Sequence, residues 1–180
     1  MTEAASAPTA GRLTLRPVRE DDEAVCRRAH EELAADAFEF LLEDPEQPWP
    51  AYVRRLDEVA RGVDLAPGRV AMTFRVADVG GQVVGRTSVR HELTEWLARY
   101  GGHIGYGVRP AYRRRGYATE ILRRSLAVAR GVGIREALLV CDNGNLGSAA
   151  VIERCGGRLD AVAPGPEGHG PIRRYWVPTS

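Results

Sequence analysis

Patterns of hydrophobic residues typical of β-strands recur along the whole chain. Several of them alternate apolar with polar residues, and a Gly80-Gly81 pair joins two alternating stretches as a hairpin turn would. Residues 136–141 instead form a continuous apolar run, which is typical of a buried central strand. The predicted strands are residues 12–18, 70–77, 82–91, 103–108, 136–141, 158–163 and 172–177.

Helical spacing of apolar residues separates these strands. It is clearest after Gly116, where Ala118, Ile121, Leu122, Ser125, Leu126 and Ala129 fall on one helical face. Further helices are predicted at about 20–33, 52–61 and 148–154. The order β-α-α-β-β-β-α-β-α-β-β predicts an α+β fold. We expect a mixed, mostly antiparallel central sheet of about six or seven strands, flanked by about four helices.

Length and composition indicate one globular domain. The chain has 180 residues, 44% of them hydrophobic, and a formal net charge of +1. Residues 1–10 are small and polar and predict a disordered N-terminal tail, so the domain is expected to span residues 11–180. No apolar run is long enough to cross a membrane. The near-zero charge argues against nucleic acid as a partner.

Residue usage excludes several kinds of chemistry. All 25 basic residues are arginine, so no lysine is present to form a Schiff base, anchor pyridoxal phosphate or complete a phosphate-binding loop. Cys26, Cys141 and Cys155 are odd in number, and their spacing fits neither a zinc site nor a disulfide framework. We therefore expect no metal, and a reducing cytoplasm as the compartment.

The most informative stretch is HIGYGVRPAYRRRGYA, residues 103–118. It predicts a short strand, a turn at Pro110, an arginine-rich loop and a helix that begins near Gly116. Backbone N–H groups at a helix N-terminus, together with arginines, suit a bound diphosphate-like anion. A run of arginines alone is more often a solvated surface, so the strand before it and the helix after it carry the interpretation.

These residues resemble the acyl-CoA signature of the GNAT superfamily of N-acetyltransferases. Val108-Arg109-Pro110, followed by Arg113-Arg114-Arg115-Gly116-Tyr117-Ala118, is similar to the family pattern V-x-P, spacer, [QR]-x-x-G-x-[GA]. CDNGNLGSAAVIERCGG further along resembles the family's second segment, in which an asparagine precedes a helix that ends at glycine. Ala118 replaces the second glycine of the pattern by another small residue.

The resemblance implies acetyl-CoA as co-substrate and a set of residues that hold it. A strand that diverges from its neighbour leaves N–H groups free for the pantetheine amides, and the loop N–H groups would hold the pyrophosphate. An N–H group near Val108 would polarise the thioester carbonyl. The expected cofactor-binding residues are Tyr106, Gly107, Val108, Arg113, Arg114, Arg115, Gly116, Tyr117, Ala118, Thr119, Asn145 and Ser148.

The catalytic residues are less well defined by the resemblance. In many relatives a tyrosine on the second helix protonates the leaving thiolate, but Ile152 occupies that position here. His103 and Glu92 are candidate bases, and Tyr106 lies next to the expected thioester position. Each has a structural alternative: a hydrogen-bonded histidine, a solvated carboxylate and a core aromatic.

The function that the resemblance implies is acyl-CoA-dependent N-acyltransfer. We expect an acetyl group to pass from acetyl-CoA to a primary amine by direct attack in a ternary complex. The acceptor would be a small-molecule amine or a protein amino terminus, and a homodimer paired through exposed strands is common in the family. The missing helix tyrosine leaves a non-catalytic acyl-CoA-binding sensor as the alternative.

Overall fold

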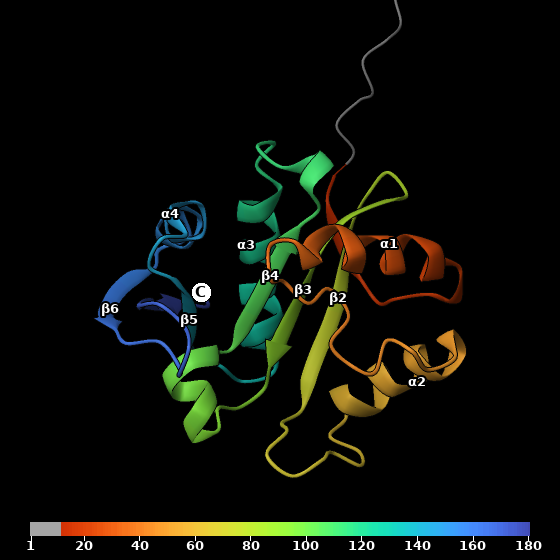
Figure 1. Ribbon diagram of the computed structural model, residues 1–180, viewed down its shortest axis with the longest axis horizontal. Coiled ribbons are helices and arrows are strands. Elements are labelled where there is room, and N and C mark those ends of the chain that lie inside the picture. Colours follow the sequence, from red (N-terminus) through yellow and green to blue (C-terminus); the bar gives the residue numbers. More distant parts are fainter. Residues whose placement is uncertain (1–11) are drawn as a thin grey trace, which may run out of the picture.

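The computed structural model describes residues 12–180, so the predicted tail at 1–10 lies outside the described residues. The predicted order of strands and α-helices is confirmed (Figure 1). The strands are β1 (Thr14–Arg16), β2 (Met72–Val79), β3 (Gln82–Arg90), β4 (Ile104–Val108), β5 (Glu136–Asp142), β6 (Arg158–Ala163) and β7 (Ile172–Pro178). The helices are α1 (Glu23–Ala34), α2 (Trp49–Ala60), α3 (Tyr117–Gly131) and α4 (Leu146–Arg154), with short turns η1 (Glu20–Asp22), η2 (Leu97–Gly101) and η3 (Pro110–Tyr112).

The α+β class is confirmed, but the sheet is divided in two. One sheet has the order β1-β2-β3-β4 and the other the order β5-β7-β6, and every ladder within them is antiparallel. Strand β5 therefore pairs with β7 alone and forms an edge of its sheet, whereas the sequence predicted a central strand. Figure 1 shows β4 and β5 facing each other across the division.

Helices cover both faces of the first sheet. α1 and α2 pack on one face of β2 and β3, where Phe40, Tyr52 and Phe74 belong to one buried cluster. α3 packs on the opposite face of β3 and β4, and α4 packs on α3, β5 and β7. A second cluster contains Ile104 from the first sheet and Tyr175 from the second, so one apolar core continues behind the division.

Two hydrogen bonds join the sheets at one end of the division. The backbone N–H of His103 donates to the carbonyl oxygen of Leu138 (2.7 Å), and the N–H of Leu138 donates to Nδ1 of His103 (2.9 Å). Gly102 has a φ of 66°, and a Cβ there would lie 2.5 Å from the same Leu138 carbonyl oxygen. A glycine is therefore required where β5 touches the start of β4.

The histidine in this junction predicts a pH dependence of stability. Burial, followed by repulsion from Arg90, lowers the pKa of His103 below its ordinary value of 6.5. The folded protein therefore binds this proton less well than the unfolded chain does. The stabilisation of the folded state by neutral His103 is complete above pH 6.5. It is lost as the pH falls below 6.5, since the unfolded state then binds more protons than the folded state does.

We expect the free energy of unfolding to fall between pH 7 and about pH 5, and to fall less in His103→Asn, whose amide oxygen can still accept from Leu138. Urea denaturation at each pH measures this. The comparison with His103→Asn removes the contribution of His91, whose pKa is also lowered by burial. Equal pH dependence in the two proteins would contradict the assignment.

Candidate functional site

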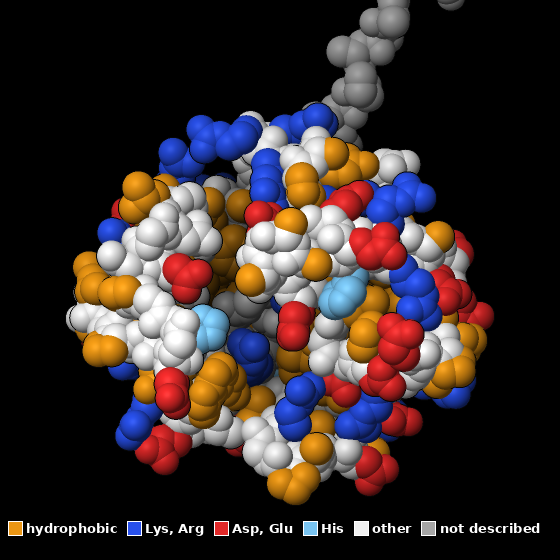
Figure 2. Space-filling model, in the orientation of Figure 1, with side chains coloured by type: hydrophobic (Ala, Val, Ile, Leu, Met, Phe, Trp, Pro, Cys, Tyr) orange, Lys and Arg blue, Asp and Glu red, His pale blue; other side chains and the backbone are white. Residues whose placement is uncertain are grey.

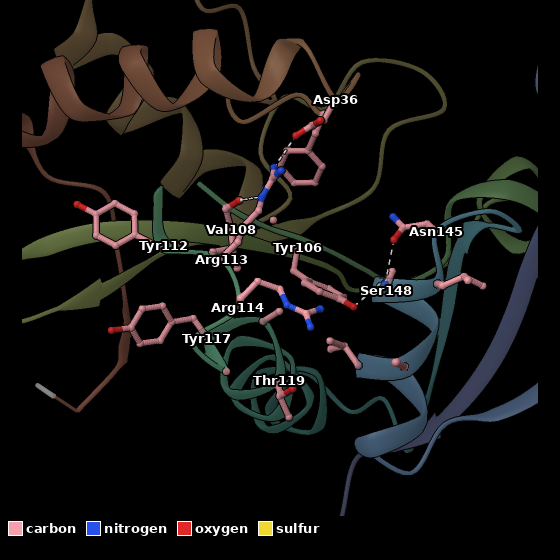
Figure 3. A pocket seen from close by; sticks show the side chains of 18 of the residues that line it. Asp36, Tyr106, Val108, Tyr112, Arg113, Arg114, Tyr117, Thr119, Asn145 and Ser148 are labelled. Atoms are coloured by element: carbon pink, nitrogen blue, oxygen red, sulfur yellow. Dashed lines mark hydrogen bonds and ion pairs between the residues drawn. The ribbon is translucent and has the colours of Figure 1, made fainter. Parts of the chain in front are cut away.

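A cleft of about 870 Å³ opens where the two sheets diverge. Its walls come from β4, the arginine loop, the N-terminal turns of α3 and α4, and the end of α1 (Figure 3). The lining residues are Leu33, Asp36, Phe38, Tyr106, Gly107, Val108, Tyr112, Arg113, Arg114, Gly116, Tyr117, Ala118, Thr119, Asn145, Leu146, Gly147, Ser148, Ala150, Val151 and Arg154.

The N-terminus of α3 has its backbone donors available. Gly116 is its N-cap residue with a φ of 82°, and no side chain caps the helix. Arg114 also has a positive φ, 61°, so left-handed residues alternate with others through the loop. Such alternation turns successive N–H groups toward one concave side, which binds anions. The N-terminus of α4 differs, since the side chain of Asn145 accepts a bond from the Ser148 N–H (3.0 Å).

Strand β4 supplies a second group of backbone donors. The N–H of Arg109 donates to the carbonyl of Val84 on β3 (2.9 Å), and the carbonyl of His103 accepts from Arg90 on β3 (2.8 Å). Since backbone groups point alternately to the two sides of a strand, the N–H groups of Tyr106 and Val108 point away from β3. They face the division between the sheets and can bind a ligand there.

Tyr106 places its hydroxyl group deep in the cleft. Its Oη lies 3.1 Å from the Oγ of Ser148, which links β4 to the first turn of α4 (Figure 3). Burial raises the pKa of Tyr106 well above its ordinary value of 10, and the bond to Ser148 opposes this only in part. The hydroxyl is therefore protonated at neutral pH. Ile152, at the position of the family tyrosine, is 1% exposed and belongs to the core.

Positive charge predominates in the cleft lining. Arg113, Arg114 and Arg154 line it, and Asp36 is the carboxylate among the lining residues. Asp36 forms an ion pair with Arg113, whose Nε also donates to the carbonyl of Val108 (3.1 Å). Arg113 is thus bound to the segment after α1, which leaves Arg114 and Arg154 for an anionic ligand.

The structure brings most of the predicted site together. All the predicted cofactor residues except Arg115 line the cleft, and Arg115 is exposed with Nη2 bonded to the carbonyl of Ala111 (3.1 Å). His103 and Glu92 do not line it. His103 is buried in the junction, with Nδ1 occupied by the Leu138 N–H, and Glu92 is exposed just after β3.

Two groups of lining residues were missed from the sequence. Gly147, Ala150, Val151 and Arg154 form one face of α4 at helical spacing, a signal that the pattern of small residues does contain. Phe38 and Asp36 arrive from the other end of the chain. No local pattern in the sequence connects them with Arg113, which is 77 residues away from Asp36.

Comparison with known proteins identifies the family. A family model described as an acetyltransferase (GNAT) domain matches residues 12–158. The chain belongs to the GNAT acetyltransferase family. The expected superfamily and enzyme class, an acyl-CoA-dependent N-acetyltransferase, are thereby confirmed.

Solved structures show the same fold at low sequence identity. Mycobacterium smegmatis RimJ, in complex with CoA-disulfide, is 20% identical with a TM-score of 0.70, covering 93% of this chain and 82% of that one. The structure of yncA from Salmonella typhimurium with its cofactor acetyl-CoA is 16% identical with a TM-score of 0.64, covering 93% of this chain and 94% of that one. No curated protein matches the chain. Within residues 12–180, no helix is long and apolar enough to cross a membrane.

The cleft geometry predicts which substitution weakens CoA binding most. In Gly116→Val the residue is forced out of the left-handed region, which reorients the loop N–H groups, whereas Arg114→Ala removes one exposed charge. We expect the dissociation constant for acetyl-CoA to rise on the order of 30-fold in Gly116→Val and about threefold in Arg114→Ala. Isothermal titration calorimetry measures both values.

Gly133→Val is the matched control, since Gly133 also has a positive φ (91°) but lies outside the cleft lining. Its acetyl-CoA affinity is expected to match that of the wild type. A larger loss in Arg114→Ala than in Gly116→Val would show that arginine charge, and not backbone N–H groups, holds the cofactor.

Proposed function

We propose that this GNAT enzyme transfers the acetyl group of acetyl-CoA to a primary amine, which attacks the thioester directly in a ternary complex. The supporting observation is that one cleft contains an uncapped helix N-terminus and the outward N–H groups of β4. The first suits a pyrophosphate and the second suit the amides of an extended pantetheine arm. With both groups bound in this way, the thioester would lie close to Tyr106 and Val108.

The N–H group of Val108 is the proposed oxyanion donor. It points into the division between the sheets, where the thioester carbonyl would lie once the arm runs along β4. As the amine nitrogen bonds to the carbonyl carbon, negative charge develops on the carbonyl oxygen, and a fixed N–H donor stabilises it. Collapse of the tetrahedral intermediate then breaks the carbon–sulfur bond and releases the CoA thiolate.

Tyr106 is the proposed acid for that thiolate. Its hydroxyl carries a proton at neutral pH, as that of an ordinary tyrosine does, and it lies at the wall where β4 meets α4. Tyr106 thus supplies from β4 the hydroxyl that Ile152 cannot supply from α4. This favours an enzyme over the alternative of a non-catalytic sensor, which rested on that missing tyrosine.

The proposed base is His103 or Glu92, acting through water. His103 could accept a proton only at Nε2, because Nδ1 is occupied by the Leu138 N–H. Glu92 is exposed and lies at the same end of β3 and β4. Both lie outside the cleft lining, so water molecules must connect either one with the amine.

The acceptor is proposed to be a small-molecule amine or a protein amino terminus. A Salmonella typhimurium neighbour, 16% identical with a TM-score of 0.65 and covering 92% and 94%, modifies the N-terminal serine of ribosomal protein L7/L12. We further propose a homodimer, because the edge strand β6 exposes Leu159 and Val162. A reducing cytoplasm is proposed as the compartment because the three cysteines are all free thiols.

Thiol release from acetyl-CoA over a panel of amines tests the activity. We expect the wild-type protein to release thiol with at least one amine class. In Tyr106→Phe we expect kcat to fall on the order of 100-fold, while the dissociation constant for acetyl-CoA changes less than about threefold. Tyr100→Phe, which removes a hydroxyl outside the cleft, serves as the control. Tight cofactor binding without thiol release for any amine would favour the sensor instead, and full activity in Tyr106→Phe would eliminate Tyr106 as the acid.

A further inference from the structure

Two arginines on β3, Arg86 and Arg90, have no acidic partner within residues 12–180. Arg86 is 3% exposed, Arg90 is half-buried, and no described carboxylate lies within ion-pair distance of either. The other buried arginine, Arg109, binds both carboxylate oxygens of Glu32 (2.8 Å each). An unpaired buried charge is costly, so Arg86 requires an explanation.

Neutral groups surround the guanidinium of Arg86. Its Nη1 donates to Ser88 Oγ (3.1 Å) and to the carbonyl of Gly105 (3.2 Å), and its Nη2 donates to the carbonyl of Glu39. The Nε has no hydrogen-bond partner within the described residues. Burial lowers the pKa of Arg86 to about 9, so the side chain is still a cation at neutral pH.

Arg90 extends the same row along β3. Residues 86, 88 and 90 alternate with residues that face α3, so they share the opposite face. The Nη1 of Arg90 donates to the carbonyls of Gly102 (3.1 Å) and Gly101 (3.4 Å), which are neutral as well. Arg90 is partly exposed, and its Nε and Nη2 have no hydrogen bond to a described residue. Its free donors can therefore reach a ligand.

The row lies on the face of the first sheet opposite α3. α3 covers one face of β3 and β4, and Arg86, Ser88 and Arg90 lie on the other, beside Gly105. The ring of Phe38 lines the cleft and lies 4.2 Å from the Arg86 guanidinium, so it separates Arg86 from the cofactor cleft. In the view of Figure 2, an arginine side chain lies at the bottom of a hollow near the middle of the molecule.

We propose that Arg90, with Arg86 behind it, forms an anion subsite of the acceptor site, and that the enzyme prefers amines that also carry a carboxylate. The inference rests on the proposed function, and it takes the amine to approach β4 from the face of the sheet that α3 does not cover. The carboxylate would accept from the free Nε and Nη2 of Arg90 and neutralise the uncompensated charge of the row. Polycationic amines would be repelled for the same reason.

Binding of matched acceptors to the protein saturated with desulfo-CoA tests the subsite without requiring acetyl transfer. One pair is the C-terminally amidated tripeptides Ser-Asp-Ala and Ser-Asn-Ala, and the other is β-alanine and β-alaninamide. Calorimetry gives the dissociation constant of each. We expect the carboxylate member of at least one pair to bind on the order of tenfold more tightly, as for a charge-assisted hydrogen bond.

Arg90→Met keeps an unbranched side chain and removes its charge, and it is expected to bring the ratio of the two dissociation constants within a pair close to one. Arg99→Met is the matched control, since it removes the same charge from an exposed arginine on η2 that is paired with Glu95. Its ratio should equal that of the wild type. Thermal melts establish that each variant is folded, and Arg90→Gln replaces Arg90→Met if the latter is not.

The proposal is overturned if neither carboxylate compound binds more tightly than its amide, absence of binding by all four compounds included. It is also overturned if the preference persists in Arg90→Met. A carboxylate preference in a protein that releases no thiol with any amine would leave the subsite standing and reject the proposed transfer reaction. The two failures are thus distinguishable.

Discussion

The separation of β4 from β5 is the constraint on which the site depends. His103 and Leu138 join the two sheets at one end, and Gly102 provides the space that this contact needs. Beyond the junction β4 pairs only with β3, so its outward N–H groups are available to a ligand. The apolar core behind the division holds the two sheets at a fixed separation. Unpaired backbone donors, normally a cost to folding, here become the means of binding.

Electrostatics divides the surroundings of the proposed reaction centre into two regions. On the α3 and α4 side, an uncapped helix N-terminus and Arg114 provide positive potential where a pyrophosphate would bind. On the α1 and α2 side, Arg86 and Arg90 provide positive charge, and no carboxylate within residues 12–180 forms an ion pair with either. Phe38 separates the two regions. A ligand charge on each side would compensate arginines that the protein itself leaves unpaired.

The sequence predicted what depends on local pattern. The element order, the hairpin at Gly80-Gly81 and nearly all of the arginine loop that lines the cleft follow from periodicity, glycine positions and the family signature. The division of the sheet could not be predicted, because β5 is equally apolar whether it pairs with one strand or two. Nor does any local pattern predict that Tyr106 contacts Ser148, that Phe38 packs on Arg86 or that Arg86 is left unpaired. Each of these features depends on contacts between distant segments.

Amide hydrogen exchange measured by mass spectrometry, with and without acetyl-CoA, tests the central claim most directly. If backbone N–H groups at the division hold the cofactor, peptides that cover residues 106–119 will exchange more slowly in the complex. Peptides from β6, at the far edge of the second sheet, will be unchanged. Protection confined to other segments, or none in 106–119 at saturating acetyl-CoA, would contradict the account.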